Sequence, residues 1–232
     1  MITDIQFSAG HADWPALRDA VLRAEDDGYA TTWVFDHFDG AMVGGDRPML
    51  EAFTLLGALA EATMTIGLGT MVANIANRHP ALLGLAASSV QRISGGRMTV
   101  GIGAGSGPGT RWAREHEARG IPLIADAEQR HRAVARSIEA VRAATDAPVL
   151  VGTNSVTLAH LAGQLADGVN VRLGHPRAAE ILAGAQAAAG ERPFATSAFT
   201  ILGQDEHVDE RAAELGLDRL VLVDLRPLDE AR

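Results

Sequence analysis

The chain has 232 residues, 47% of them hydrophobic, and a net charge of −9; this suits a single domain over residues 1–232 and disfavours a nucleic-acid partner. It has no cysteine, which excludes a disulfide framework, thiolate catalysis and cysteine-ligated zinc. All 20 basic residues are arginine, so a lysine Schiff base and a Walker-type phosphate loop are excluded as well.

Short hydrophobic runs alternate with longer helical segments along the whole chain. We expect strands at residues 5–9, 31–37, 64–73, 97–105, 148–154, 168–172, 194–202 and 220–225. We expect helices at residues 13–28, 46–60, 80–93, 126–145, 155–167, 176–190 and 208–215. Eight such units predict a parallel sheet covered by helices, closed as a TIM-type (β/α)8 barrel.

An open, doubly wound sheet is the alternative fold. It is disfavoured because the run GIGAG lacks the third glycine of a dinucleotide fingerprint, with Ser106 following. The chain ends soon after residue 225, so we expect no full final helix. The run AATDAPV, residues 143–149, also passes directly into the fifth strand, without an inserted segment.

Several targeting and metal motifs are missing from the sequence. No apolar run approaches the roughly 18 residues needed to cross a bilayer, and the amino terminus has no basic region typical of a signal peptide. We therefore expect a cytoplasmic protein with no membrane partner. The eight histidines do not form a metal-binding motif, and there is no Gly-x-Ser-x-Gly elbow of a hydrolase.

The second strand ends in the stretch TTWVFDHFDG. In a barrel of this type the active site lies at the carboxyl ends of the strands. Asp36 and His37 are the titratable pair at such an end, and Asp36 could hold the tautomer of His37. Both could instead be structural hydrogen-bonding residues of the loop, and Asp39 is expected to be a solvated or turn-forming residue.

Two further strand ends consist mainly of small residues, which leave backbone groups accessible. GIGAGSGPG would allow close approach by a flat ring or a phosphate, or serve only as a turn. VGTNS runs into a helix start, where free N–H groups can bind an anion; ordinary capping by Asn154 or Ser155 is the alternative.

Four stretches together resemble the luciferase-like flavin and deazaflavin oxidoreductases: TTWVFDHFDG, PMLEAFTLLGALAEATMTIGLGTMV, RHPALLGLAASSVQRISGGRMTVGIGAG and LADGVNV. The resemblance implies the barrel fold and a cofactor ring across its mouth, either coenzyme F420 or FMN. It implies a catalytic role for Asp36 and His37, and a cis peptide bond at Met71–Val72. The implied cofactor-binding residues are Ser8, Asp36, His37, Thr70, Met71, Val72, Gly103, Ala104, Gly105, Ser106, Gly152, Thr153, Asn154 and Ser155.

The sequence departs from that family at Ser106, where many deazaflavin relatives have a glutamate, so that role is vacant or filled by another group. The family's usual lid before the fifth strand is missing too. Three functions stay open: F420-dependent hydride transfer to or from an organic substrate, FMN-dependent monooxygenation, and a non-catalytic flavin-binding paralogue. We also expect a homodimer, because an incomplete helical layer leaves apolar surface to cover.

Overall fold

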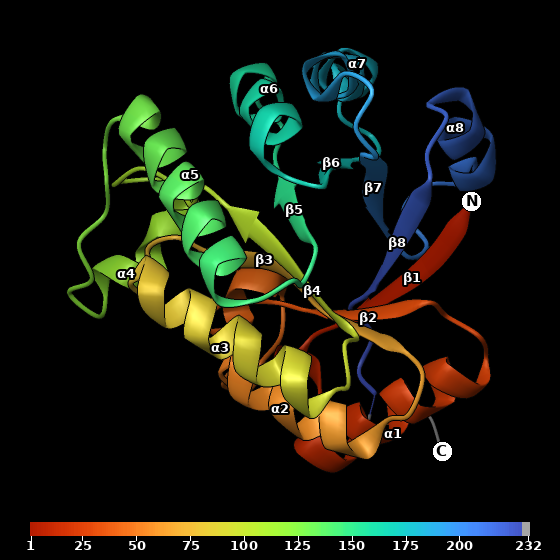
Figure 1. Ribbon diagram of the computed structural model, residues 1–232. Coiled ribbons are helices and arrows are strands. Elements are labelled where there is room, and N and C mark those ends of the chain that lie inside the picture. Colours follow the sequence, from red (N-terminus) through yellow and green to blue (C-terminus); the bar gives the residue numbers. More distant parts are fainter. Residues whose placement is uncertain (229–232) are drawn as a thin grey trace.

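Eight parallel strands close into a barrel in the computed structural model of the protein, which describes residues 1–228 (Figure 1). The strands pair in chain order, and β8 pairs with β1 to close the sheet. This confirms the TIM-barrel prediction. The strands are β1 Ile2–Phe7, β2 Thr31–Val34, β3 Gly67–Asn74, β4 Met98–Gly103, β5 Val149–Gly152, β6 Gly168–Arg172, β7 Ala195–Ile201 and β8 Arg219–Asp224.

Helices surround the barrel (Figure 1). A long helix follows each of the first six strands, and the short α8 follows β7. Side chains cap several of them: Asp13 accepts a hydrogen bond from the Ala16 amide, and Asp126 accepts one from Gln129. The helices are α1 Trp14–Asp26, α2 Ala52–Ala62, α3 Pro80–Ile93, α4 Arg114–Glu117, α5 Ala127–Ala144, α6 Val156–Leu165, α7 Ala178–Ala189 and α8 Val208–Glu214. Short 3-10 helices are η1 Ala9–His11, η2 Gly40–Val43 and η3 Arg111–Ala113.

Large side chains fill the interior of the barrel. Trp33, Met71, Leu150 and Val221 come from four different strands and form one buried cluster, with Phe199 packed against it. Gly69 leaves room for the indole, since a Cβ there would lie 2.4 Å from the Trp33 ring. A ligand therefore has to lie across one end of the barrel, because the interior is occupied.

The helix predicted at residues 46–60 is wrong at its start. Helix α2 begins at Ala52, and Glu51 caps it by accepting a hydrogen bond from the Thr54 amide at 2.7 Å. The turn-forming Asp46 and Pro48 belong instead to the loop after η2, where Pro48 forms an isolated antiparallel bridge with Asp39.

The last part of the barrel is lightly covered, as expected. Within residues 1–228, β8 is followed by no helix, and α5 is joined to β5 by only the four residues 145–148. None of the helices in this described part of the chain is both long and apolar enough to cross a membrane.

Candidate active site

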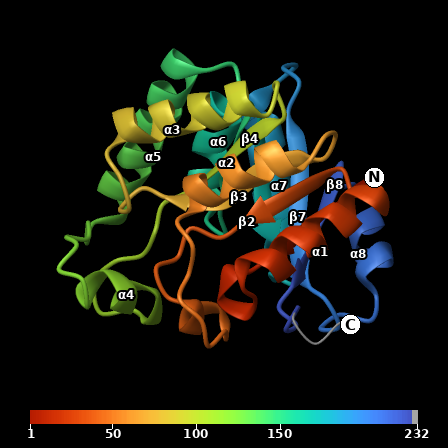
Figure 2. The ribbon, with the colours of Figure 1, turned by 90° about the horizontal axis from the view of Figure 1, so that it is seen from below.

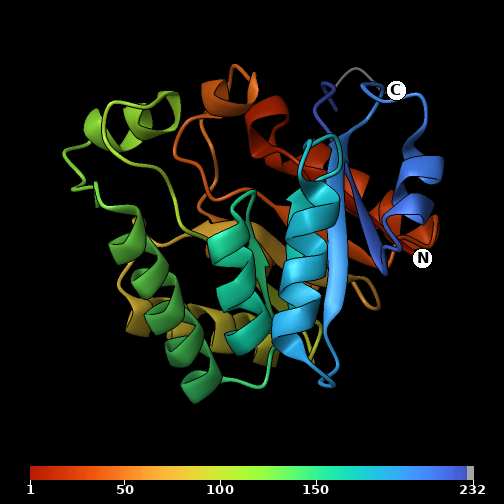
Figure 3. The ribbon, with the colours of Figure 1, turned by 90° about the horizontal axis from the view of Figure 1, so that it is seen from above.

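The loops that follow β2 and β4 lie at the carboxyl ends of the strands, at one end of the barrel. Helix α4, in the β4 loop, and η2, in the β2 loop, are on the same side as the segment after β8 (Figures 2 and 3). We call this end the mouth of the barrel. Residues 36–37, 103–106 and 152–155 fall at the carboxyl ends of β2, β4 and β5, whereas residues 70–72 lie inside β3, at the register shift before its last two residues.

Asp36 does not hold His37, and that expectation is wrong. Its carboxylate forms a two-pronged ion pair with Arg78, at 2.7 and 2.8 Å, and also accepts a hydrogen bond from the Asn74 amide at 2.8 Å. Arg78 extends the pair to Glu51 at 2.7 Å. Burial lowers the pKa of Arg78, but the hydrogen bonds that Arg78 donates to Asp36 outweigh this effect and raise that pKa. Asp36 thus ties the β2 loop to the end of β3.

The partner of His37 is Glu115, which sequence reasoning missed. His37 Nδ1 lies 2.6 Å from Glu115 Oε1, and Oε2 accepts hydrogen bonds from the amides of Phe38 at 2.7 Å and Asp39 at 3.3 Å. The Glu115 side chain is 1% exposed and that of His37 is 22% exposed. Burial raises the pKa of Glu115, but the hydrogen bonds from His37 and Phe38 reverse this, so the pKa lies below its ordinary value.

An ionised carboxylate can only accept hydrogen bonds, so the Nδ1 of His37 must carry the proton toward Glu115. In the neutral imidazole Nε2 then has no proton and is an acceptor. Because His37 is partly exposed at the mouth, this nitrogen is a candidate site for taking up a proton. The carboxylate comes from α4, within the β4 loop, and not from the strand end at Ser106.

Aromatic residues line the same side of the mouth. The ring of Trp112 lies nearly parallel to the imidazole of His37, with centroids 6.0 Å apart and an angle of 28°. Trp112 is 47% exposed, and the guanidinium of Arg111 lies 4.9 Å from the centre of its ring. Together His37 and Trp112 form an aromatic wall that a planar ligand could contact.

His116 connects the loops around the mouth. It is buried, its Nε2 lies 2.7 Å from Asn77 Oδ1, and its ring meets that of Phe38 edge-on at 5.3 Å. Burial lowers its pKa. Asn77 in turn donates to the backbone carbonyl of Asp36 at 2.7 Å, so the loops after β2, β3 and β4 are connected.

The floor of the mouth is smooth because two strands end in glycine. A Cβ at Gly103 would lie 2.4 Å from Val72 Cγ2, and one at Gly152 would lie 2.5 Å from Val72 Cγ1. The peptide bond Met71–Val72 is cis, which confirms that prediction. Gln6 donates to the Met71 carbonyl at 2.8 Å. Val72 therefore covers both glycines and presents an apolar surface.

The remaining predicted residues mostly have local structural contacts. Ser8 accepts from the Gly10 amide at 3.1 Å and so caps η1. Ser106 accepts from the hydroxyl of Thr110 at 3.0 Å. Ser155 accepts from the Leu158 amide and caps α6.

Three more of the predicted residues have similar contacts. Thr153 accepts from the Ser155 amide at 2.9 Å, and Thr70 Oγ1 donates to the Gly101 carbonyl at 2.8 Å. Asp39 caps η2, as expected of a turn residue.

A hollow of about 690 Å³ opens at the opposite end of the barrel, around the starts of β5, β6 and β7. Its acidic residues already have partners: Asp167 binds Arg142 and the Val149 amide, and Asp218 binds Thr196. This end of a barrel usually serves stability and not chemistry. We therefore assign the candidate site to the mouth.

The sequence matches the luciferase-like monooxygenase family over residues 3–220. This chain belongs to that family. It is 28% identical over 220 residues to the 5,10-methylenetetrahydromethanopterin reductase of Archaeoglobus fulgidus, covering 82% of this chain. It spans only 60% of that relative's length.

Two solved structures share the fold at 15% sequence identity. An F420-dependent secondary alcohol dehydrogenase, in complex with an F420–acetone adduct, superposes with a TM-score of 0.77 over 98% of this chain and 94% of its own. A riboflavin lyase (RcaE) with modified FMN and riboflavin superposes with a TM-score of 0.64 over 92% of this chain and 65% of its own. At this identity the likeness concerns the fold alone.

Proposed function

We propose that the protein is a luciferase-like oxidoreductase that binds coenzyme F420 across the mouth and moves hydride between it and an organic substrate. The observation that carries the proposal is the imidazole of His37, partly exposed beside an apolar floor and held by the buried Glu115 carboxylate. The deazaflavin is preferred over FMN because of the reductase and dehydrogenase to which the chain is similar. The whole chain, residues 1–232, would act as one domain.

The residues at the mouth fit a flat ring. Gly103 and Gly152 contribute no side chains, and Val72 gives the floor an apolar face against which a planar heterocycle can pack. The wall of His37 and Trp112 stands beside it. We propose that the ring and its polar tail are held by Ser8, Asp36, His37, Thr70, Met71, Val72, Gly103, Ala104, Gly105, Ser106, Gly152, Thr153, Asn154 and Ser155.

When bound, the deazaflavin supplies or accepts hydride at a ring carbon. The role of the chain is then to move the accompanying proton. His37 Nε2 would take the proton from a substrate hydroxyl, and Glu115 would stabilise the imidazolium that forms. Asp36 acts through the loop and not on the substrate, because Arg78 neutralises its carboxylate. We propose it as a positioning residue.

Ligand titration tests the cofactor assignment. Purified protein is titrated with F420 and, in parallel, with FMN, and ring absorbance and fluorescence are recorded. F420 binding alone supports the proposal, FMN binding alone favours a monooxygenase, and binding of neither ring refutes both enzymes. His37→Gln should keep cofactor binding and lose hydride transfer. Unchanged turnover in that variant would contradict the role of the imidazole.

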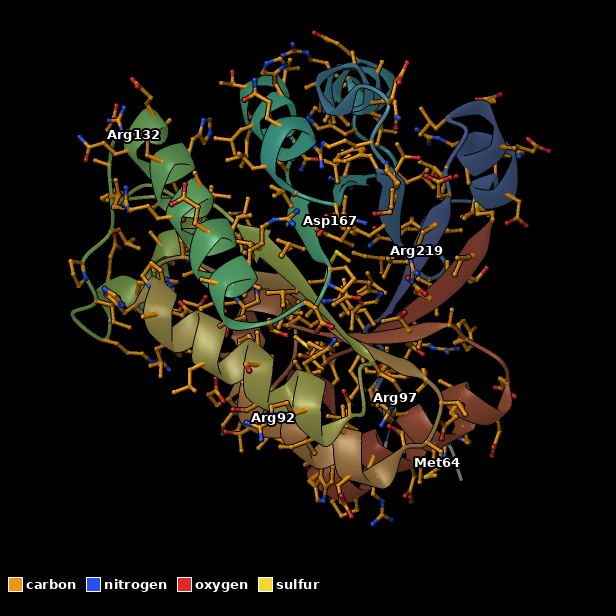
Figure 4. The ribbon with its side chains drawn as sticks, in the orientation of Figure 1. Met64, Arg92, Arg97, Arg132, Asp167 and Arg219 are labelled. Carbon is orange, nitrogen blue, oxygen red and sulfur yellow. The ribbon has the colours of Figure 1, made fainter. Side chains whose placement is uncertain are left out.

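We also propose a homodimer that covers the outer face of α3. Leu82, Leu85 and Ile93 follow one side of this helix and are 54%, 62% and 55% exposed. Arg92 projects from the end of the same helix, and Met64 lies at the outer edge near α2 (Figure 4). Such an apolar stripe, next to helix α2, is typical of an interaction surface.

Mass in solution tests this proposal. The wild-type protein should elute as a dimer by light scattering, and Leu85→Glu should shift it toward the monomer, since a charge would be buried in the contact. A monomeric wild type would overturn the proposed dimer without affecting the cofactor proposal.

A further inference from the structure

Trp112 is exposed beside the imidazole that would accept the substrate's proton. It lies in a short helical segment, residues 111–117, in which η3 runs directly into α4. Side chains three positions apart lie on the same side of such a segment, so Trp112 and Glu115 both face His37. Glu115 is buried there, but Trp112 is 47% exposed. The indole therefore has apolar surface left for a ligand in the mouth.

Arg111 and Arg114 place two positive charges next to this indole. Both side chains are exposed, and the guanidinium of Arg111 lies 4.9 Å from the centre of the indole ring. Within the described part of the chain, neither arginine forms an ion pair with a carboxylate. The carboxylates of α4 have other partners: Glu115 binds the imidazole, and Glu117 accepts a hydrogen bond from the Gly109 amide at 2.7 Å. In a protein with a net charge of −9, two neighbouring guanidinium groups of this kind indicate an anionic ligand.

The position of the imidazole assigns these groups to the substrate and not to the cofactor ring. A hydroxyl that gives its proton to His37 has to lie within hydrogen-bond distance of the imidazole, about 3 Å. The centre of the Trp112 ring is 6.0 Å from the centre of that imidazole, so the atoms next to the hydroxyl come within contact distance of the indole. The proposed place of the cofactor ring, in contrast, is the apolar floor at Val72.

We propose that Trp112, Arg111 and Arg114 form the substrate-recognition surface of the mouth, and that the substrate is a planar aromatic molecule with a carboxylate or a similar anionic group. The indole would stack on the planar part, and the guanidinium groups would bind the anionic group. The inference rests on the proposed function, and it narrows the organic substrate to a planar acid. Proton transfer stays with His37.

Three probe molecules separate the effect of planarity from that of charge. Naphthoate is planar and anionic, naphthylmethanol is planar and neutral, and cyclohexanecarboxylate is anionic without an aromatic ring. Binding is followed by NMR of the indole N–H groups; the chain has three tryptophans, and Trp112→Phe identifies the signal of Trp112. The charge is removed in the double variant Arg111→Gln/Arg114→Gln. The matched control is Arg132→Gln, which removes the same charge from an exposed arginine of α5 that already pairs with Glu128.

Naphthoate should shift the Trp112 signal of the wild type in a saturable way and leave the signal of the buried Trp33 unchanged. The double variant should bind naphthoate about tenfold more weakly and naphthylmethanol equally well, because only charge-assisted bonds are lost. Arg132→Gln should match the wild type, and cyclohexanecarboxylate should bind more weakly than naphthoate because it cannot stack. Equal naphthoate affinities in the double variant and the wild type would overturn the inference, as would a Trp112 signal that neither planar probe shifts.

Titration of the F420-loaded protein separates this inference from the proposed function. Naphthoate should bind with the cofactor in place, whereas displacement of F420 by naphthoate would put the probe on the floor at Val72 and overturn the inference. Failure of F420 to bind the wild type would refute the proposed function. The naphthoate titration of the free protein would then still decide the role of Trp112 and the two arginines.

Discussion

Replacing Glu115 with glutamine should reverse the tautomer of His37. In the wild type the carboxylate accepts from Nδ1–H, so in the neutral imidazole Nε2 carries no proton. In Glu115→Gln the amide oxygen has to stay with the backbone donor Phe38 N, at the Oε2 position, because that donor cannot change. The new NH2 group then faces Nδ1, and the imidazole can pair with it only by carrying its proton on Nε2.

The stability cost follows from the same contacts. Glu115 accepts two short hydrogen bonds, at 2.6 and 2.7 Å, and a longer one at 3.3 Å. A bond to a charged group contributes about 1.5–3 kcal/mol and a neutral one about 0.5–1.5 kcal/mol, so losing the charge costs about 1 kcal/mol for each short bond. Glu115→Gln should therefore lower the free energy of unfolding by about 2 kcal/mol. Glu115→Ala should cost more, since the Phe38 amide then has no acceptor.

The assay combines urea unfolding with ¹⁵N NMR of the imidazole. Wild type should show a protonated Nδ1 for His37, and Glu115→Gln a protonated Nε2, with His37→Gln used to assign the signals. Hydride transfer should fall in Glu115→Gln, because Nε2 no longer accepts a proton. An unchanged tautomer in a folded Glu115→Gln variant would refute the reasoning.

The contribution of Glu115 to stability should be lost as the pH falls. The pKa of Glu115 in the folded protein lies below the ordinary carboxyl value of about 4.3, so its stabilisation is complete above that pH. As the pH falls below about 4.3, the unfolded chain takes up the proton first, and the contribution is lost as the pH passes through the folded pKa. The stability difference between wild type and Glu115→Gln should shrink over this range.

Two further substitutions test the floor and the β2 loop. Gly152→Ala should lower the free energy of unfolding by about 1–3 kcal/mol, because its Cβ would lie 2.5 Å from Val72; Gly174→Ala, with open space around it, should change it by less than about 0.5 kcal/mol in the same urea titration. Arg78→Gln should cost about 3 kcal/mol by leaving the buried carboxylate of Asp36 without its partner, and adding Asp36→Asn should restore part of it. Equal losses in the single and double variants would show that this ion pair is not the cause.

Most of the fold could be predicted from the local pattern of hydrophobic residues in the sequence. Strands buried on both faces are continuous hydrophobic runs, and the run at 220–225 differs from β8 by one residue at each end. The start of α2 was harder to predict, because Asp46 and Pro48 are common helix-start residues. Their role in the loop depends on the bridge between Asp39 and Pro48, a contact between residues nine positions apart that no helical period reveals.

The site was predictable only where it depends on strand ends. His37 follows β2, so its position at the mouth follows from the barrel. Asp36 was wrongly paired with it, since neighbours in extended backbone point in opposite directions and the carboxylate reaches Arg78 instead. Glu115 lies 78 residues from His37, in a loop without strong periodicity, and only its acidic character in the long loop after β4 could have suggested a partner.

The proton moves only during the reaction, and this predicts how the loss of His37 changes the kinetics. His37 is held by Glu115 at the β2 and β4 ends of the mouth. Substrate binding in the ground state does not need the proton to move, so His37→Gln should lower kcat with little change in KM. A rise in KM with unchanged kcat in this variant would show that the imidazole only binds the substrate, and would contradict its role in proton transfer.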